Sequence, residues 1–271
     1  MNSTQVAVGI ALAVGVAFLA RRARALAPSG AWAAVLVGSI TFGFGGLLPA
    51  LLLMTFFISS SLLSRAGAAR KVAVAAAFDK GGERDAGQVL ANGGVAAAAS
   101  LAYGLTRDPR WLAAIAGALA AVNADTWATE LGVLARGWPR RLTDGRLVEP
   151  GTSGAASVEG LLAAIGGAAL IGLPAGLAAP YAALQGPSAG TALGVAATLG
   201  GFFGSLADSL LGATVQAIYW CPACGKETER HPTHICGTAT RRLRGWPWLR
   251  NDGVNLAASI VGAAIALFLT M

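Results

Sequence analysis

Apolar runs of nearly bilayer-crossing length recur along the sequence and constrain its fold more than any other feature. About 20 consecutive apolar residues cross a bilayer as a helix. Runs near that length predict spans at residues 4–20, 30–44, 46–63, 88–104, 111–134, 156–178, 190–219 and 253–270. Only 12% of the residues are charged, against about a quarter in soluble domains. The composition therefore excludes an ordinary soluble enzyme.

We predict an all-α fold, a polytopic transmembrane helix bundle of about eight spans in which residues 1–271 form a single domain. The number of spans depends on residues 30–63, because their glycines and Pro49 fit either two short helices or one kinked helix. One kinked helix there would leave seven spans. The first span carries its arginines after the apolar run, which favours a retained helix over a signal peptide. A smaller loop at 220–252 is inserted between the last two spans.

The basic residues predict how the bundle is oriented. Of the 20 lysines and arginines, all but Arg107 and Arg110 fall in alternate loops. Cytoplasmic loops carry the excess of positive charge, so these loops are expected in the cytoplasm and both termini outside. A prokaryotic plasma membrane is the expected location. The net charge of +7 then reflects the orientation of the protein in the membrane, and we predict no nucleic-acid partner.

Acidic residues inside the predicted spans point to a functional site. Ionisable groups in a span are costly, about 2.5–3.5 kcal/mol each, and usually line a polar cavity. Asp125 and Asp208 are predicted to lie at similar depths in two helices, and a hydroxyl residue follows each of them, Thr126 and Ser209. Carboxylates and hydroxyls supply the hard oxygen ligands that Mg²⁺ prefers. They predict a magnesium and phosphate site. The alternative is that each acid pairs with a buried arginine or backbone group and fixes helix register.

Further polar residues close to the predicted cytoplasmic ends of the spans are candidates for the same site. We expect Glu130 and Asp252 to be second ligands or orienting groups, although Asp252 also fits a helix N-cap. The candidates for substrate and nucleotide binding are Lys80, Arg84, Gln88, Asn92, Asn123, Thr152, Ser153, Glu159, Asn251 and Asn255. Glycines beside Lys80 and Arg84 suit a triphosphate cradle, but a basic loop touching anionic lipid has the same composition. The loop at Thr152 and Ser153 fits either phosphate binding or helix capping.

All three cysteines and both histidines lie in one loop. Cys221 and Cys224 form a C-x-x-C pair, and His234 and Cys236 follow at a spacing typical of structural zinc sites. We predict a structural Zn²⁺ on these four residues, with His231 as the alternative fourth ligand. Redox use of Cys221 and Cys224 is the competing interpretation.

These motifs together resemble the integral membrane family known as domain of unknown function 92, whose characterised plant members are phytyl-phosphate kinases. The resemblance begins near Gly30 and rests on RDAGQVLANGG (84–94), NADTWATELG (123–132), PGTSGAASVEG (150–160), GSLADSLLGA (204–213), the Cys/His loop and NDGVN (251–255). It implies transfer of a phosphoryl group from a nucleoside triphosphate, with CTP favoured, to an isoprenyl monophosphate. This sequence has Ala155 and Ala156 where similar sequences carry glycine, which weakens a backbone cradle there.

Two other functions fit the same residues. A nucleotidyltransferase acting on a lipid phosphate would use the same Mg²⁺ and triphosphate but release pyrophosphate. An ion-coupled transporter would use the intramembrane acids to bind an ion. The expected partners are a nucleoside triphosphate, an isoprenyl monophosphate and the lipid bilayer, and assembly into a homo-oligomer is compatible with the sequence.

Overall fold

A computed structural model describes residues 3–66, 82–135, 137–178 and 189–271, which form eight long helices and five short strands. The helices are α1 (Ser3–Arg22), α2 (Pro28–Gly45), α3 (Leu47–Arg65), α5 (Ala86–Thr106), α6 (Arg110–Gly132), α7 (Val158–Ala178), α8 (Ala189–Thr214) and α9 (Asn251–Leu269). They match the eight predicted segments in order and approximate position. Six of them, all except α2 and α6, are long and apolar enough to cross a membrane. The predicted all-α membrane architecture is confirmed, with a slightly lower count of clear spans.

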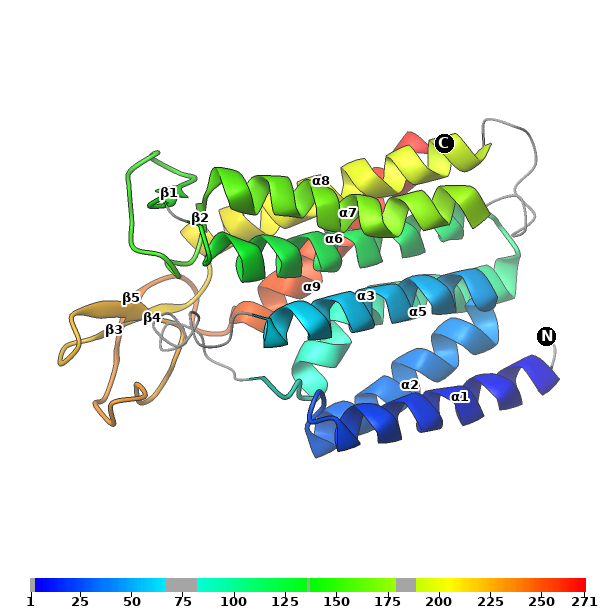
Figure 1. The fold of residues 1–271 in the computed structure, drawn as a ribbon, viewed down its shortest axis with the longest axis horizontal. Coiled ribbons are helices and arrows are strands. Elements are labelled where there is room, and N and C mark those ends of the chain that lie inside the picture. Colours follow the sequence, from blue (N-terminus) through cyan, green and yellow to red (C-terminus); the bar gives the residue numbers. More distant parts are fainter. Residues whose placement is uncertain (1–2, 67–81, 136, 179–188) are drawn as a thin grey trace.

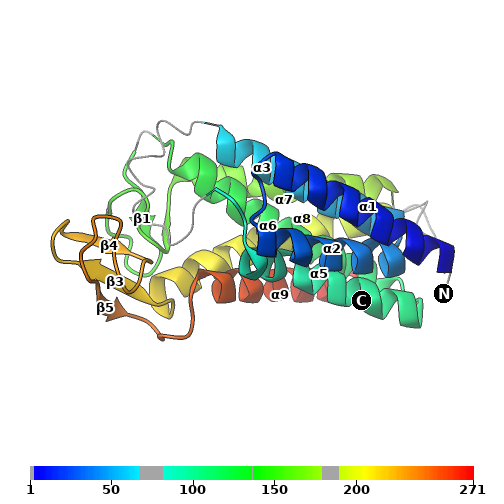
Figure 2. The ribbon, with the colours of Figure 1, turned by 90° about the horizontal axis from the view of Figure 1, so that it is seen from below.

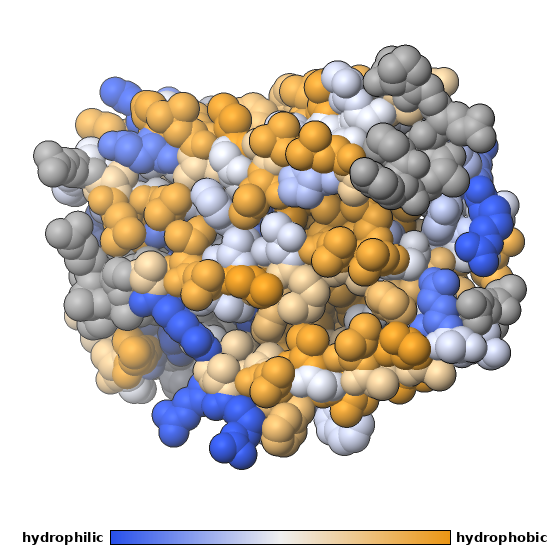
Figure 3. Space-filling view, turned by 45° about the vertical axis from the view of Figure 1, so that its right-hand side comes forward, coloured by the Kyte–Doolittle hydropathy of each residue, from blue (hydrophilic) through white to orange (hydrophobic). Residues whose placement is uncertain are grey.

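The outer surface of the bundle is apolar. Exposed large side chains include Phe18, Trp32, Leu105, Leu173 and Leu177, each more than 60% exposed. Figure 3 shows one face, where hydrophobic residues cover much of the surface and strongly hydrophilic residues lie mostly toward its edges. In water such a surface would be an aggregation liability, whereas in a bilayer it is the expected contact with lipid.

The break within residues 30–63 is as predicted, whereas the end of α8 differs from the sequence prediction. Residues 30–63 form two helices, separated at Gly46, whose φ of +86° is accessible to glycine at little cost. The predicted span 190–219 ends early, because α8 stops at Thr214 and Ile218–Cys221 forms strand β3. The β-branched and aromatic residues of that strand favour extended backbone.

Small residues bring α6, α8 and α9 into close contact at the core. A Cβ atom at Gly117 of α6 would lie 2.4 Å from the carbonyl oxygen of Gly262 on α9, and one at Gly200 of α8 would lie 2.5 Å from the same oxygen. Small residues at such crossings let membrane helices pack backbone to backbone. The crossing fixes α6 and α8 side by side, and these two helices carry Asp125 and Asp208.

A small β-containing segment, residues 215–250, connects α8 to α9; we call it the Cys/His module. Its sheet has the order β4-β3-β5, with β4 at Lys226–Thr228 and β5 at Arg241–Arg244 antiparallel to β3. A second, two-stranded sheet pairs β1 (Arg140–Arg141) with β2 (Ala155–Ala156) between α6 and α7.

Both small sheets lie at one end of the helix bundle. Both chain termini lie toward the opposite end, as Figures 1 and 2 show from two directions. This placement agrees with an even number of crossings. The end that carries the sheets is the one predicted to face the cytoplasm.

Candidate functional site

A cavity of about 750 Å³ opens among the helices at the end that carries the Cys/His module. Its wall combines residues from α3, α5, α6, α8 and α9, the loop before α7, and the module. Predicted site residues in this wall are Arg84, Gln88, Asn92, Asp125, Thr126, Glu130, Thr152, Ser153, Asp208, Ser209, Asn251, Asp252 and Asn255. The fold thus gathers side chains from distant segments around one space.

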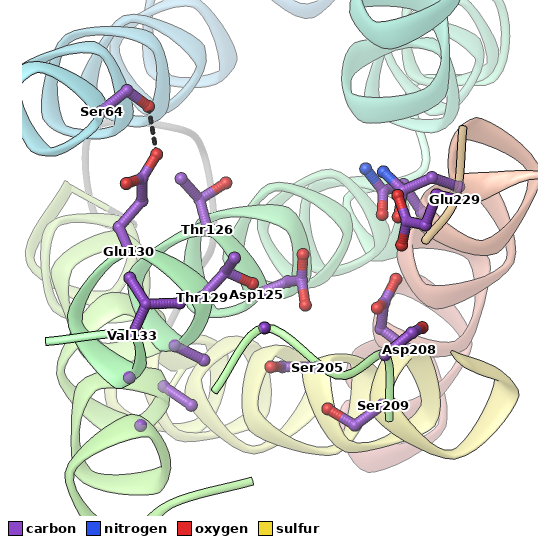
Figure 4. A pocket seen from close by; sticks show the side chains of 18 of the residues that line it. Ser64, Asp125, Thr126, Thr129, Glu130, Val133, Ser205, Asp208, Ser209 and Glu229 are labelled. Atoms are coloured by element: carbon purple, nitrogen blue, oxygen red, sulfur yellow. Dashed lines mark hydrogen bonds between the residues drawn. The ribbon is translucent and has the colours of Figure 1, made fainter. Parts of the chain in front are cut away.

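Three carboxylates converge in the wall of this cavity. The carboxyl groups of Asp125 on α6 and Asp208 on α8 lie within hydrogen-bonding reach of each other. Glu229, from the Cys/His module, is close enough to Asp208 to act on it through its charge. Figure 4 shows the three side chains directed toward a common region. The Oδ1 atom of Asp208 is buried and has no hydrogen-bond partner among the described residues.

A cluster of acids with an unused oxygen is the donor set that a hard divalent cation requires. Like charges at this spacing repel each other strongly unless a cation or a shared proton lies between them. Among the described residues, the charged groups that act on Asp208 are Asp125 and Glu229, both acidic. Carboxylate oxygens suit Mg²⁺, which usually completes its shell with water and phosphate oxygens. Asp125 and Asp208 are therefore residues that could hold such a cation.

Glu130 and Arg84 lie on another part of the wall. The Ser64 hydroxyl of α3 donates a hydrogen bond of 2.5 Å to Oε1 of Glu130, as Figure 4 shows. Arg84 donates to the hydroxyls of Ser61 at 2.8 Å and Ser60 at 3.0 Å. Burial lowers the pKa of Arg84, and the negative charge of Glu130 opposes that effect. A guanidinium stays protonated in proteins, so Arg84 supplies a fixed positive charge.

Gln88 and Asn92 share one face of α5 at the cavity wall. Gln88 also takes part in a capping box with Asp85, because each accepts a hydrogen bond from the other's backbone N–H. The Oδ1 atom of Asn92 is buried without a hydrogen-bond partner in the described structure. Asn92 is therefore the better placed of the two to receive a ligand donor.

The loop before α7 is held against the end of α8. Ser153 donates to Oε1 of Gln216 at 3.1 Å, and Nε2 of Gln216 donates to Glu229 at 2.8 Å. Arg244 donates to the backbone oxygens of Gly212 at 2.6 Å and Ser153 at 3.2 Å. Burial lowers the pKa of Arg244, whereas the charge of Glu227 raises it. These contacts set the position of Glu229 relative to Asp208.

Two predicted residues, Asn123 and Glu159, lie outside the cavity wall. Asn123 is fully buried, donates to the Gly167 oxygen at 2.7 Å and accepts from the Ser59 hydroxyl at 2.8 Å, so it joins α6 to α7 and α3. Glu159 is exposed in the first turn of α7 and does not line the cavity. Lys80 falls outside the described residues.

The interpretation of Asp252 as an N-cap is not supported, because Arg250 is the N-cap of α9 and Asp252 lies in its first turn.

The four predicted zinc ligands come together in the Cys/His module. The ligand atoms of Cys221, Cys224, His234 and Cys236 all lie within 4.8 Å of one another. Two of the separations are 3.6 Å between the sulfurs of Cys221 and Cys236, and 3.5 Å between the Cys224 sulfur and Nδ1 of His234. Tetrahedral zinc places such ligand atoms about 3.5–3.8 Å apart. The group has the composition and spacing of a structural zinc site.

His231 is not part of this group. Its ring stacks on Tyr219 with a centroid distance of 4.4 Å, and its Nδ1 lies 3.4 Å from the Thr240 hydroxyl. All three cysteines are free thiols in the structure. Hydrogen bonds from Thr238 and then His234 lower the pKa of Cys236 to about 5, whereas the hydrogen bond with Cys236 raises the pKa of Cys224 to about 11. A thiol that is already ionised at neutral pH is suited to metal binding.

Sequence reasoning missed Glu229, Ser64 and Gln216. Glu229 lies in a charged stretch of the module that resembles ordinary solvent-facing loop. Ser64 and Gln216 sit at helix ends, where polar residues are common. Only the packing of the module onto α8 shows that Glu229 reaches the acidic pair.

The family profile described as "Integral membrane protein DUF92" matches residues 11–263, nearly the whole chain. The chain belongs to this family. The chain is also 33% identical over 263 residues to "Protein PGR" of Arabidopsis thaliana, a match that covers 91% of this chain and 89% of the relative. The DUF92 assignment confirms the resemblance inferred from the motifs.

Two prokaryotic relatives extend the comparison. An uncharacterized membrane protein of Methanocaldococcus jannaschii is 32% identical, with 97% of this chain and 93% of the relative covered. An uncharacterized membrane protein of Synechocystis is 29% identical, with 89% of this chain and 81% of the relative covered. No solved structure matches the chain.

Proposed function

We propose that this DUF92 protein is a membrane-embedded kinase that transfers a phosphoryl group from a nucleoside triphosphate, CTP by preference, to an isoprenyl monophosphate. The products are a nucleoside diphosphate and an isoprenyl diphosphate. The observation that carries the proposal is the meeting of Asp125 and Asp208 in the wall of a large polar cavity. The choice of isoprenoid and nucleotide comes from the family resemblance.

The acidic cluster would hold Mg²⁺ through Asp125 and Asp208, with Glu229 as a third carboxylate at the site. When bound, the cation would neutralise phosphate oxygens and align the triphosphate. The protein's own part is to keep these carboxylates together, which the crossing of α6 and α8 does through the packed glycines. Asp252, also in the wall, is proposed as a further orienting group.

Positive side chains in the same wall would bind the phosphates. Arg84, Arg230 and Arg250 line the cavity, and Lys80 is a further candidate outside the described residues. Arg84 is oriented by the hydroxyls of Ser60 and Ser61. A guanidinium held in this way recognises phosphate oxygens with defined geometry.

The reaction requires little proton chemistry from the protein. The acceptor is already an anionic phosphate, so no strong general base is needed, and catalysis is chiefly positioning and charge neutralisation. Glu130 is then an orienting group, fixed by Ser64, that faces the charge of Arg84. A lipid acceptor also explains why such an enzyme would be embedded in a membrane.

We further propose that Cys221, Cys224, His234 and Cys236 bind a structural Zn²⁺. The cation would complete a four-ligand site with no open position, which is typical of structural zinc. Its role would be to stabilise the module from which Glu229 reaches the acidic pair.

Product analysis tests the proposed function. Purified protein in lipid nanodiscs is incubated with Mg²⁺, geranylgeranyl monophosphate and each of the four ribonucleoside triphosphates, and the products are identified by mass spectrometry. A kinase gives the isoprenyl diphosphate and a nucleoside diphosphate, with CTP most effective. Pyrophosphate with a nucleotide-linked lipid would instead establish nucleotidyl transfer. Absence of any nucleotide-dependent product would contradict the proposal and favour the transporter alternative.

A further inference from the structure

A second cavity, of about 280 Å³, lies among α1, α2, α3 and α5, and we call it the apolar groove. Its wall is hydrophobic except at three described residues, Arg84, Gln88 and Asn92. Along α3 the wall runs from Leu47 to Phe57, which at 1.5 Å per residue is about 15 Å. The groove therefore extends through about half of a hydrocarbon core some 30 Å thick.

The polar residues of the groove are also residues of the large polar cavity. Arg84, Gln88 and Asn92 appear in both walls, so the two spaces meet at the start of α5. Arg84 brings a positive charge to this junction, and its guanidinium lies 5.7 Å from the ring centre of Phe57. The buried Oδ1 of Asn92 has no hydrogen-bond partner in the described structure. The junction thus joins a cationic, polar end to an apolar channel.

This junction has the chemistry of a site for one aliphatic chain that ends in an anion. The chain would lie against the apolar wall, and the anion would meet Arg84 and enter the polar cavity that holds the acidic pair. Away from Arg84 the groove offers no counter-charge, so the anion of such a ligand would be recognised at the junction and not along the groove.

We propose that the apolar groove binds the hydrocarbon tail of the isoprenyl monophosphate and that Arg84 marks the boundary between tail and phosphate. The headgroup assignment rests on the proposed function. The groove makes the enzyme selective for chain length, because a long tail makes van der Waals contacts along its wall that a five-carbon tail cannot reach. Acceptors long enough to fill the groove should therefore have a much lower KM than a five-carbon acceptor.

A substitution that fills the groove tests this assignment. Ala50 lines the groove on α3, and Ala50→Phe should reduce the ratio of kcat/KM for a twenty-carbon over a five-carbon monophosphate at least tenfold. The matched control is Ala11→Phe on α1, an exposed position outside the groove wall, which should keep the wild-type ratio. Thermal unfolding verifies that both variants fold. A folded Ala50→Phe protein with the wild-type ratio would overturn the proposal.

A binding measurement separates this proposal from the proposed function. A fifteen-carbon monophosphate with a diazirine at the end of its tail is photo-crosslinked to wild-type protein in nanodiscs, and labelled peptides are located by mass spectrometry. Labelling should map to α1, α2, α3 or α5 and fall at least fivefold in Ala50→Phe, with or without turnover. Labelling confined to α6–α9, or scattered over the outer surface, would refute the tail site even if the protein proves to be a kinase.

Discussion

Asp125 of α6 and Asp208 of α8 place their carboxyl groups within hydrogen-bonding reach of each other in the wall of the large cavity. The pair depends on the close approach of α6, α8 and α9, where the carbonyl oxygen of Gly262 occupies space that any side chain at Gly117 or Gly200 would need. The distance between the two aspartates therefore depends on a few small residues that let these helices pack closely.

Replacing Asp208 should separate catalysis from folding. Asp208→Asn removes a charge that a cation would need, so we expect kcat to fall by at least ~100-fold. The metal-free protein should keep or slightly raise its melting temperature, because repulsion from Asp125 and Glu229 is relieved. Asp108→Asn, at an acid paired with Arg110 at the other end of the bundle, is the control and should change kcat less than twofold. Retained phosphoryl transfer by Asp208→Asn would falsify the assignment.

Glu229→Gln should weaken metal use without abolishing it. The side chain acts on Asp208 from the Cys/His module, so its loss should raise the Mg²⁺ concentration for half-maximal rate about tenfold. Saturating Mg²⁺ should restore much of the rate. Glu149→Gln, an exposed residue paired with Lys226, should leave this concentration unchanged. Equal Mg²⁺ requirements in the two variants would exclude Glu229 from the site.

The acidic pair could be predicted from the sequence, because an acidic side chain in a membrane span costs free energy and is therefore rare. Glu229 could not, because a charged residue in a charged loop carries no comparable penalty and its role depends on how the module docks. The polar residues near the helix starts gave a mixed result. Asn255 lines the cavity, whereas Glu159 is exposed to solvent. A polar residue at a helix start serves capping, solvation or a site equally well, and only the fold distinguishes them.

The Cys/His group should retain one zinc per chain after purification. His234→Gln removes a ligand, and we expect at least tenfold weaker zinc retention, measured by inductively coupled plasma mass spectrometry, together with a lower melting temperature. His231→Gln removes a ring that stacks on Tyr219 and lies outside the group, so it should retain the metal. Wild-type protein free of zinc, or equal zinc in both variants, would contradict a structural zinc site.

Docking of the module should be sensitive to one glycine. Gly245 has φ of +82°, and a Cβ atom there would lie 1.8 Å from the Gln216 oxygen. Gly245→Ala should therefore displace the module, reduce kcat and lower the melting temperature. Gly237 has the same φ but open space around it, so Gly237→Ala should show only the cost of the backbone conformation, about 1 kcal/mol. Similar melting temperatures for the two variants would argue against this tight contact.

The distribution of basic residues predicts which end of the helix bundle faces the cytoplasm. Thr270→Cys, near the C-terminus, should react with a membrane-impermeant maleimide in intact cells, because that end of the bundle is predicted to face outward. Asp144→Cys, between β1 and β2, should react only after the membrane is permeabilised. The reverse pattern would place the large cavity outside the cytoplasm, away from the cytoplasmic nucleotide pool.

Binding of a divalent cation to the acidic pair is the most direct test of this account. Mn²⁺, a spectroscopic substitute for Mg²⁺, is titrated into purified zinc-loaded protein with CTP, and bound ions are counted by electron paramagnetic resonance. We predict one tight CTP-dependent Mn²⁺ site per chain, lost in the Asp125→Asn/Asp208→Asn double variant and retained in Asp108→Asn. Unchanged Mn²⁺ binding in the double variant would contradict the proposal that these two aspartates form the metal site of a nucleotide-dependent enzyme.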